Sequence, residues 1–353
     1  MTSELVFDMT SDEILSIHQQ VDLQGYNTLA VPVTARWFAA INHQQQLQQA
    51  LAFAQQQSTQ VVVLGGGSNL LLPEQLDALV VHILLHGRKV VAETDTEVLV
   101  AIAAGENWHQ TVLWCLHRGY HGLENLALIP GSVGAAPIQN IGAYGVELAQ
   151  CFESLEAVNI ATGERVSLNR EQCQFGYRDS IFKQQLLDKL VITQVTLRLQ
   201  RQFIPVLTYP ALQQQLADRL PQQLAAEEVV GAVMAIRQSK LPDPQQLPNA
   251  GSFFKNPVVT QATYEQLRQR FPQLVAYPQS DGRYKLAAGW LLDKAGWKGK
   301  MVNRIAMHQQ QALVLTNPDR RSARDIQQFV TEVQTSISAR FGVQLEIEPR
   351  VYS

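Results

Sequence analysis

Cysteine is scarce in this sequence, and the few cysteines present form no recognisable pattern. Cys115, Cys151 and Cys173 are the only three among 353 residues, and no two of them form a CxxC pair. Their number is odd, and no histidine lies at metal-ligand spacing from them. These absences exclude a disulfide framework and argue against a zinc site. We expect three reduced thiols, buried or half-buried.

Charge of one sign and long apolar runs are also lacking. Lysine and arginine number 28 against 31 acidic residues, which gives a net charge of −3 and a pI of about 6.2. This balance offers no basic footprint for nucleic acid and no polybasic patch for a membrane surface. No apolar run approaches the ~20 residues that cross a bilayer, and residues 1–13 lack the basic start of a signal peptide. The sequence therefore predicts a cytoplasmic protein without nucleic-acid or membrane partners.

What is present is typical of a globular protein with two or three domains. Hydrophobic residues make up 46% of the chain and charged residues 17%. Helical and strand patterns are interspersed without a regular βαβ period, which favours an α+β fold. We expect helices at 42–58, 108–116, 224–236, 260–271, 285–295 and 322–342, and strands at 60–64, 98–103, 155–160, 164–168, 190–199, 312–316 and 343–351.

A strand that runs into consecutive glycines is the first candidate for ligand binding. Residues 60–64, QVVVL, lead into Gly65-Gly66-Gly67-Ser68-Asn69. Glycine backbone can approach a ligand closely and present N–H groups to phosphate oxygens. No Gly-Lys-Ser/Thr follows, and Pro73 arrives too soon for a helix, so neither a Walker A loop nor a dinucleotide-binding turn is expected. A phosphate cradle and a plain tight turn both remain open.

A second candidate is the long stretch 123–145, LENLALIPGSVGAAPIQNIGAYG. It contains too many glycines and prolines for a helix. Its small residues and few charges suit a segment that lies flat against a planar ligand and a pyrophosphate. The alternative is a buried loop packed on the core, although loops of this length are uncommon unless they are functional.

Together these two stretches resemble a known family. Residues 65–69 followed by 131–137, GSVGAAP, resemble the FAD-binding domain shared by vanillyl-alcohol-oxidase-type flavoenzymes and the MurB family. Four further motifs are similar to the MurB family specifically, and the resemblance covers nearly the whole chain from about residue 20. They are PIQNIGAYG at 137–145, GYRDS at 176–180, NAGSFFKNP at 249–257 and KLAAGWLL at 285–292.

The resemblance implies an α+β fold with vanillyl-alcohol-oxidase-type (PCMH) FAD-binding domains and a smaller C-terminal α+β substrate domain. It implies a flexible extension at 1–19, FAD-binding subdomains at 20–88 and 89–240, a substrate domain at 241–342, and a strand at 343–353 that returns to the active site. The FAD would be bound without a covalent link. The expected cofactor-binding residues are Gly65, Gly66, Gly67, Ser68, Asn69, Leu70, Gly105, Ile129, Pro130, Ser132, Gly134, Ile138, Gly142, Ile192, Arg237 and Arg350.

Three residues would carry the catalysis, and each has a plainer alternative. Arg178 would stabilise enolate-like charge, but on residue types alone it is an ion-pair partner of Asp179. Ser252 would be the general acid, although serines after Asn-Ala-Gly more often serve in turns or as N-caps. Alternation along a strand places Glu346 and Glu348 on one face, so spacing leaves both open. The resemblance selects Glu348; Pro349 departs from the family's usual small aliphatic residue.

The resemblance also implies substrate contacts. Tyr209 matches a tyrosine that folds over the substrate diphosphate in the branch of the family with an extra loop. As residue types, Lys240 and Lys255 suit a diphosphate. The full expected set is Tyr144, Tyr209, Lys240, Lys255, Asn256 and Gln310. No metal is implied.

The implied reaction is the NADPH-dependent reduction of the enolpyruvyl ether of UDP-N-acetylglucosamine to UDP-N-acetylmuramate. Hydride would pass from NADPH to FAD, then from flavin N5 to C3 of the enolpyruvyl group, and Ser252 would protonate C2. This reaction belongs to peptidoglycan precursor synthesis, and through it to cell shape and division. We expect a monomer. An FAD oxidase that uses oxygen and a non-catalytic nucleotide-sugar or flavin-binding protein are the rival functions.

Overall fold

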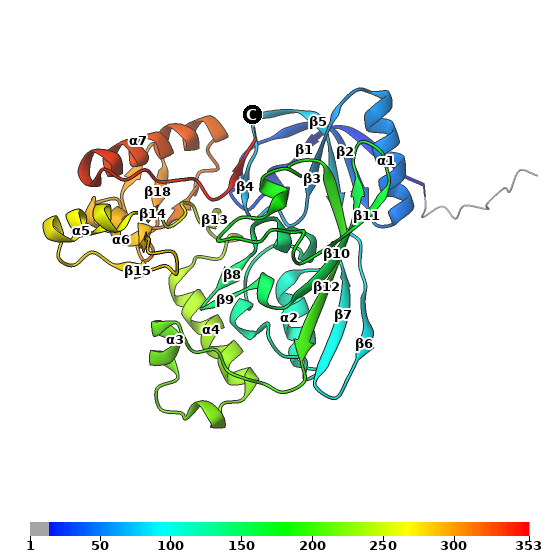
Figure 1. Ribbon diagram of the computed structural model, residues 1–353. Coiled ribbons are helices and arrows are strands. Elements are labelled where there is room, and N and C mark those ends of the chain that lie inside the picture. Colours follow the sequence, from blue (N-terminus) through cyan, green and yellow to red (C-terminus); the bar gives the residue numbers. More distant parts are fainter. Residues whose placement is uncertain (1–13, 353) are drawn as a thin grey trace, which may run out of the picture. The chain divides into compact units, whose positions relative to one another are not determined.

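The computed structural model describes residues 14–352, which divide into two compact units (Figure 1). Unit 1 comprises the chain up to Val21, then Ala35–Gly66 and Asp77–Met234. Unit 2 comprises Asp22–Thr34, Gly67–Leu76 and the chain from Ala235. Residues 1–13 of the expected flexible extension lie outside the described residues, whereas Ile17 already opens the first strand.

Unit 1 begins with a four-stranded sheet in the order β1-β2-β5-β3. Helix α1 packs on it through the stripe Leu47, Leu51 and Ala54, as the amphipathic pattern predicts. These side chains join a core cluster with Ile41 and Leu79. The elements are β1 (Ile17–Asp22), β2 (Thr34–Ile41), α1 (Gln44–Gln56), β3 (Gln60–Leu64) and β5 (Gln75–Ile83).

The second sheet of unit 1 has five strands in the order β11-β10-β12-β7-β6. The strands predicted at 155–160 and 164–168 are present as β10 and β11, which the turn at Thr162-Gly163 joins as an antiparallel hairpin. The strands are β6 (Arg88–Glu93), β7 (Glu97–Ala103), β10 (Phe152–Asn159), β11 (Arg165–Asn169) and β12 (Leu190–Gln200). Along the last third of β12, buried and exposed residues alternate, so one face of the sheet is open to solvent there.

Short elements complete unit 1. The stretch 123–145 forms no α-helix, as its glycines and prolines indicate, but it does form 3-10 turns. The elements are α2 (Trp108–Leu116), η3 (Glu124–Leu126), η4 (Val133–Gln139), β8 (Gly142–Ala143), β9 (Val146–Glu147), η5 (Leu148–Gln150), η6 (Ile181–Lys183), α3 (Pro210–Gln215) and η7 (Pro221–Gln223). The chain passes into unit 2 within α4 (Ala226–Lys240).

Unit 2 contains a four-stranded sheet β13-β19-β18-β17, a three-stranded sheet β14-β16-β15 and the parallel pair β20-β4. Its long helix α7 buries one face, including Phe329 against Trp297. Its elements are η2 (Gln24–Tyr26), β4 (Leu70–Leu71), β13 (Asn249–Ser252), β14 (Val258–Val259), α5 (Gln261–Arg270), β15 (Ala276–Pro278), β16 (Tyr284–Leu286), α6 (Ala288–Lys294), β17 (Met301–Val302), β18 (Ile305–Met307), β19 (Val314–Thr316), α7 (Ala323–Phe341) and β20 (Arg350–Val351).

Two element predictions need correction. The expected helix at 285–295 begins only at Ala288, because Lys285 pairs with both Val258 and Tyr277 in the three-stranded sheet. The expected strand at 343–351 is a regular ladder only over β20. Within the described residues, no helix is long and apolar enough to cross a membrane.

Candidate functional site

The two glycine-rich segments are in direct contact inside unit 1. A Cβ added to Gly66 would lie 2.8 Å from the Cα of Gly131, and one added to Gly65 would lie 2.4 Å from Oγ of Ser132. A side chain at Gly66 would therefore push the two backbone segments apart, whereas one at Gly65 would displace the Ser132 hydroxyl. The glycines after β3 are explained first by this packing of backbone on backbone.

Peptide N–H groups around this contact are available to a ligand. Within the described part of the chain, the N–H groups of Gly65, Gly66, Gly131 and Ser132 donate to no other protein group. Peptide donors gathered on two touching turns suit the oxygens of a pyrophosphate. These residues therefore fit the pyrophosphate of the FAD that the sequence predicts, and the phosphate cradle stays a prediction.

Other glycines of the predicted set are occupied by packing. Gly134 donates to the carbonyl of Ala104, and a Cβ at Gly134 would lie 2.5 Å from the Ala104 Cβ. Gly105 donates to the carbonyl of Leu85, and its added Cβ would meet backbone atoms at Leu84 and Leu85. Both positions need glycine for a close approach of two chain segments, whatever else they contact.

Gly67, Asn69, Leu70 and Arg350 come together in unit 2. Gly67 has a φ of +62°, and a Cβ there would lie 1.9 Å from the carbonyl oxygen of Tyr26. The N–H of Arg350 donates to the carbonyl of Asn69, and Leu70 pairs with Arg350 between parallel strands β4 and β20. This arrangement explains why residues so distant in sequence both appear in the predicted cofactor set.

Arg178 lies in unit 1 on a tight turn, where its φ is +52°. Its guanidinium donates to the carbonyl of Gly142 at 2.7 Å. The buried amide of Asn140 donates to the carbonyl of Gly176 and to the carboxylate of Glu147. The turn that presents Arg178 is thus tied to the hairpin of β8 and β9.

The predicted neighbour Asp179 has its own donors in unit 1. Its carboxylate accepts from the Gln184 side chain and from the N–H of Ser180. The Ser180 hydroxyl in turn donates to the carbonyl of Ile138 at 2.6 Å, which brings this predicted cofactor residue beside the turn of Arg178.

Ser252 and Glu348 lie on neighbouring backbone segments of unit 2. Ser252 ends strand β13 beyond a register shift, after Gly251 with a φ of +67°, so it is neither a turn residue nor an N-cap. The N–H of Glu348 donates to the carbonyl of Phe253, the residue after Ser252. Two of the three predicted catalytic residues are therefore brought together by the fold of a single unit.

The two glutamates that spacing leaves open have different surroundings, and the role of Glu348 stays a prediction. Glu346 is exposed and forms an ion pair with Lys255, a predicted diphosphate ligand. Glu348 follows the bridge between Phe254 and Ile347. Pro349 loses no hydrogen bond, since the chain changes partner there: Glu348 donates to Phe253 and Arg350 donates to Asn69.

The remaining predicted residues are divided between the units. Tyr144 and Tyr209 pack edge to face in unit 1, with ring centroids 5.0 Å apart. In unit 2 the Asn256 side chain accepts from the N–H of Ala288, at the start of α6, and Gln310 is exposed. Unit 1 also holds Ile129, Pro130 and Ile192, the last buried in β12; unit 2 also holds Ser68, Arg237 and Lys240.

The three cysteines are all free and buried, as expected. Burial raises the pKa of Cys115, Cys151 and Cys173 to about 12. Thiols with such pKa values are structural rather than reactive.

Comparisons with known proteins show the family of this chain. Residues 35–169 match an FAD binding domain, and residues 243–352 match the C-terminal domain of UDP-N-acetylenolpyruvoylglucosamine reductase. That reductase from Pseudomonas putida is 47% identical to this chain over 334 residues, which are 95% of this chain and 98% of the relative. The chain belongs to the UDP-N-acetylenolpyruvoylglucosamine reductase (MurB) family. The MurB protein of Pseudomonas aeruginosa is 46% identical over 96% of this chain and 99% of its own length.

A solved structure supports the fold. The crystal structure of MurB from Thermus caldophilus superposes with a TM-score of 0.68 and covers 96% of this chain and 100% of that chain, at 22% sequence identity. The predicted family and fold class are confirmed, and the chain is an FAD-dependent oxidoreductase. Its place in the branch with the extra tyrosine loop stays a prediction.

Two residues at the site are missing from the predicted set. Gly131 is the contact of Gly66, and its φ of +111° is a reason for glycine. Asn125 is almost fully buried among apolar residues and bonds to the carbonyls of Tyr144 and Val206. A lone asparagine within an apolar run is a signal that could have found it, because a buried amide requires partners.

Proposed function

We propose that this MurB-family enzyme uses NADPH to reduce the enolpyruvyl ether of UDP-N-acetylglucosamine to UDP-N-acetylmuramate. The observation that carries the proposal is the adjacency of Ser252 and Glu348 in unit 2, in a chain 47% identical to a named reductase. The cytoplasmic location and the monomeric state stay predictions.

FAD, when bound, supplies the hydride chemistry, since it can be reduced by NADPH and can pass hydride to C3 of the enolpyruvyl group. Its pyrophosphate would accept hydrogen bonds from four peptide N–H groups that have no protein acceptor among residues 14–352, those of Gly65, Gly66, Gly131 and Ser132. A group held by peptide N–H donors and packing needs no covalent bond, which fits non-covalent binding.

In this proposal Ser252 donates the proton that arrives at C2. A neutral serine is a weak acid, so the hydroxyl needs cationic neighbours to stabilise its conjugate base. Lys255 is less suited to stabilise the serine alkoxide, because its ammonium group already forms an ion pair with Glu346. Lys240, at the end of α4, is the other candidate.

Arg178 and Glu348 would act on the charge that develops in the enolpyruvyl group. A guanidinium stabilises an enolate-like carboxylate through charge-assisted hydrogen bonds. The hydrogen bond from Arg178 to the Gly142 carbonyl fixes one end of the planar guanidinium. The orientation of the whole group is thereby restricted. Glu348 would orient the reacting group from its own backbone position beside Phe253.

The Ser252→Ala variant tests the proposal. We expect it to retain FAD and to be reduced by NADPH at a rate close to that of the wild type, while reduction of the nucleotide sugar falls by about a hundredfold or more. Stopped-flow flavin absorbance separates the two half-reactions. Ser336→Ala, on α7 of the same unit, is the matched control and should leave both unchanged.

Two results would count against the proposal. Loss of both half-reactions together in Ser252→Ala would show that this serine supports the fold or the flavin instead of protonating substrate. Rapid oxygen consumption by the reduced wild type, with no response to the nucleotide sugar, would favour an oxidase.

A further inference from the structure

The segment 203–209, here called the strap, runs from the end of β12 to α3 without regular structure. Its first residue, Phe203, packs on His121 with ring centroids 5.4 Å apart, while Ile204 is 71% exposed. A segment with so little backbone pairing needs other contacts to hold one conformation.

Asn125 supplies such a contact from the short turn η3. Its side-chain nitrogen donates to the carbonyl of Tyr144 at 2.8 Å and to the carbonyl of Val206 at 2.9 Å. A primary amide has two N–H groups, so both are used, one on each segment. The residue is 3% exposed, so water cannot replace these bonds without opening the structure.

A second contact joins the same two segments independently. Tyr144 and Gly145 both have positive φ, +50° and +88°, and a Cβ on Gly145 would lie 2.1 Å from Oγ1 of Thr208. The left-handed turn therefore leaves room for the strap to lie directly on the backbone. Beyond it the rings of Tyr144 and Tyr209 meet edge to face, at an interplanar angle of 79°.

We propose that Asn125 is a positioning residue that holds the strap against the 144–145 turn, so that Tyr209 and Tyr144 are placed for the nucleotide sugar before it binds. The inference rests on the proposed function, in which these two tyrosines contact substrate. The Tyr209 side chain is 38% exposed and accessible to a ligand. Without Asn125 the substrate would have to order the strap at the expense of binding energy.

Asn125→Asp is the sharpest test, because it keeps the shape and replaces both donors by an acceptor. We expect KM for the enolpyruvyl nucleotide sugar to rise about tenfold with kcat within about twofold, as for the loss of two buried hydrogen bonds. Hydrogen exchange of residues 203–209 in the free protein should become faster. Asn317→Asp is the matched control: that buried asparagine donates to the carbonyls of Leu29 and Arg321, and its loss should leave the KM unchanged.

A double-mutant cycle separates positioning from general damage. If Asn125 acts through Tyr209, Asn125→Asp should add less than about twofold to the KM of Tyr209→Ala. Gly145→Ala strains the turn through its positive φ and meets the Thr208 hydroxyl, so it should reproduce the raised KM and the faster exchange, and it serves if Asn125→Asp fails to fold. Additive effects in the cycle, or an unchanged KM in Gly145→Ala, would overturn the role of Asn125. A wild type that oxidises no NADPH when given the nucleotide sugar would overturn the proposed function itself.

Discussion

At the scale of single residues, the glycine-rich segments gain a more specific meaning than their composition gives. Sequence alone indicates that Gly65–Gly67 allow backbone to approach something closely. The structure identifies the first neighbour as protein: Gly131 for Gly66, Ser132 for Gly65 and Tyr26 for Gly67. The proposed ligand site lies at the contact between Gly65–Gly66 and Gly131–Ser132. In the described part of the chain, the peptide N–H groups of these residues have no protein acceptor.

Gly66→Ala should therefore reduce stability and flavin retention together. The added Cβ meets backbone of Gly131, which cannot rotate away, so we expect a loss of about 2 kcal/mol in the free energy of unfolding. Urea unfolding and the flavin absorbance of the purified protein measure the two effects. The control is Gly231→Ala: this exposed glycine lies inside α4 with nothing within 4 Å of the added Cβ, and alanine should stabilise by about 0.5–1 kcal/mol.

Residue identity predicts a role best where the neighbours are local in sequence. Ser252 and Glu348 could be proposed from motifs, but the choice between Glu346 and Glu348 could not be made from alternation. The family resemblance selects Glu348, and the structure adds that Glu346 pairs with Lys255, 91 residues away in the chain. The sequence could have indicated Asn125 as a buried amide, but it could not have indicated its partners, which lie 19 and 81 residues away.

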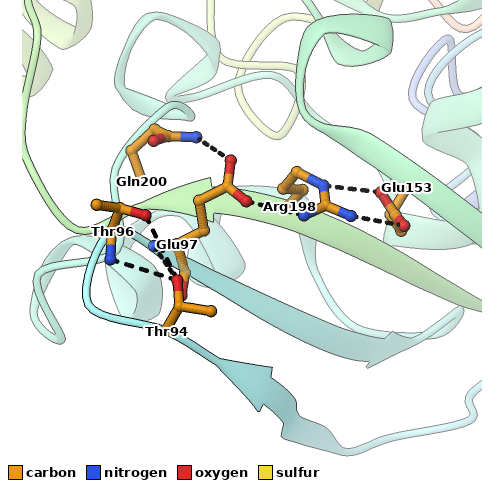
Figure 2. Close-up of polar contacts among 6 residues, drawn as sticks. All are labelled: Thr94, Thr96, Glu97, Glu153, Arg198 and Gln200. Carbon is orange, nitrogen blue, oxygen red and sulfur yellow. Dashed lines mark hydrogen bonds and ion pairs between the residues drawn. The ribbon is translucent and has the colours of Figure 1, made fainter.

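At the scale of elements, the open face of the five-stranded sheet carries a charge network (Figure 2). Arg198 on β12 binds Glu153 on β10 through two nitrogens, at 2.9 and 2.8 Å, and Glu97 on β7 at 2.8 Å. Gln200 donates to the other oxygen of Glu97 at 3.1 Å. Three adjacent strands are thus linked across the ladder, and the network acts as a unit more than as separate pairs.

This network predicts an acid sensitivity that can be traced to Glu97. Hydrogen bonds from Gln200 and then Arg198 hold the pKa of Glu97 below its ordinary value of 4.5. A depressed folded-state pKa means that the stabilisation is complete above the unfolded value and is lost as pH falls through the folded value. Glu97→Gln should therefore flatten the fall in stability below about pH 4.5, in urea unfolding measured as a function of pH.

Gln200→Leu provides the companion measurement. It removes the larger contributor to the depressed pKa of Glu97 while leaving the carboxylate, so the folded-state pKa moves back toward the unfolded value. The acid-induced loss of stability should therefore be smaller than in the wild type and be complete at a higher pH. An acid limb identical in all three proteins would show that Glu97 contributes nothing to stability.

Helices were predicted more reliably than strands, and the reason is physical. Helix α1 forms where its sequence has the apolar stripe Leu47, Leu51 and Ala54. Helix α7 begins where the Ser322 side chain accepts from the N–H of Asp325. Both signals are local in sequence. Lys285 reads as helical by propensity, yet its pairing with two strands overrides that preference. Strand partners distant in the chain leave no such local trace.

At the scale of the whole molecule, the free thiols report on one unit only. Cys115, Cys151 and Cys173 all lie in unit 1. Their pKa values of about 12 mean that thiolate is scarce at pH 8 even where reagent could reach it. Labelling should therefore require unit 1 to open.

We expect the native protein to react negligibly with a thiol-specific chromogenic disulfide at pH 8, and three equivalents to react once it is unfolded in urea. The rise in labelling should follow the loss of structure in unit 1. Rapid reaction of even one equivalent in the native state would contradict the buried placement of these side chains.

The pairing of β4 with β20 has a consequence for how the protein is made. Strand β4 pairs with β20 through the N–H groups of Arg350 and Tyr352, which donate to the carbonyls of Asn69 and Leu71. Gly67 to Leu76 belong to unit 2 although they are translated near the start of unit 1. On a ribosome, β4 must wait for its strand partner while almost all of the later chain is synthesised, although Thr28 and Thr34 already donate to the carbonyls of Gly67 and Glu74 in this piece. A nascent chain arrested after Met234 could assemble much of its first core, yet Ser68 and Asn69 would still lack their neighbouring strand. If Ser68 and Asn69 hold the flavin, as the family resemblance implies, its capture is a late event that follows the completion of translation.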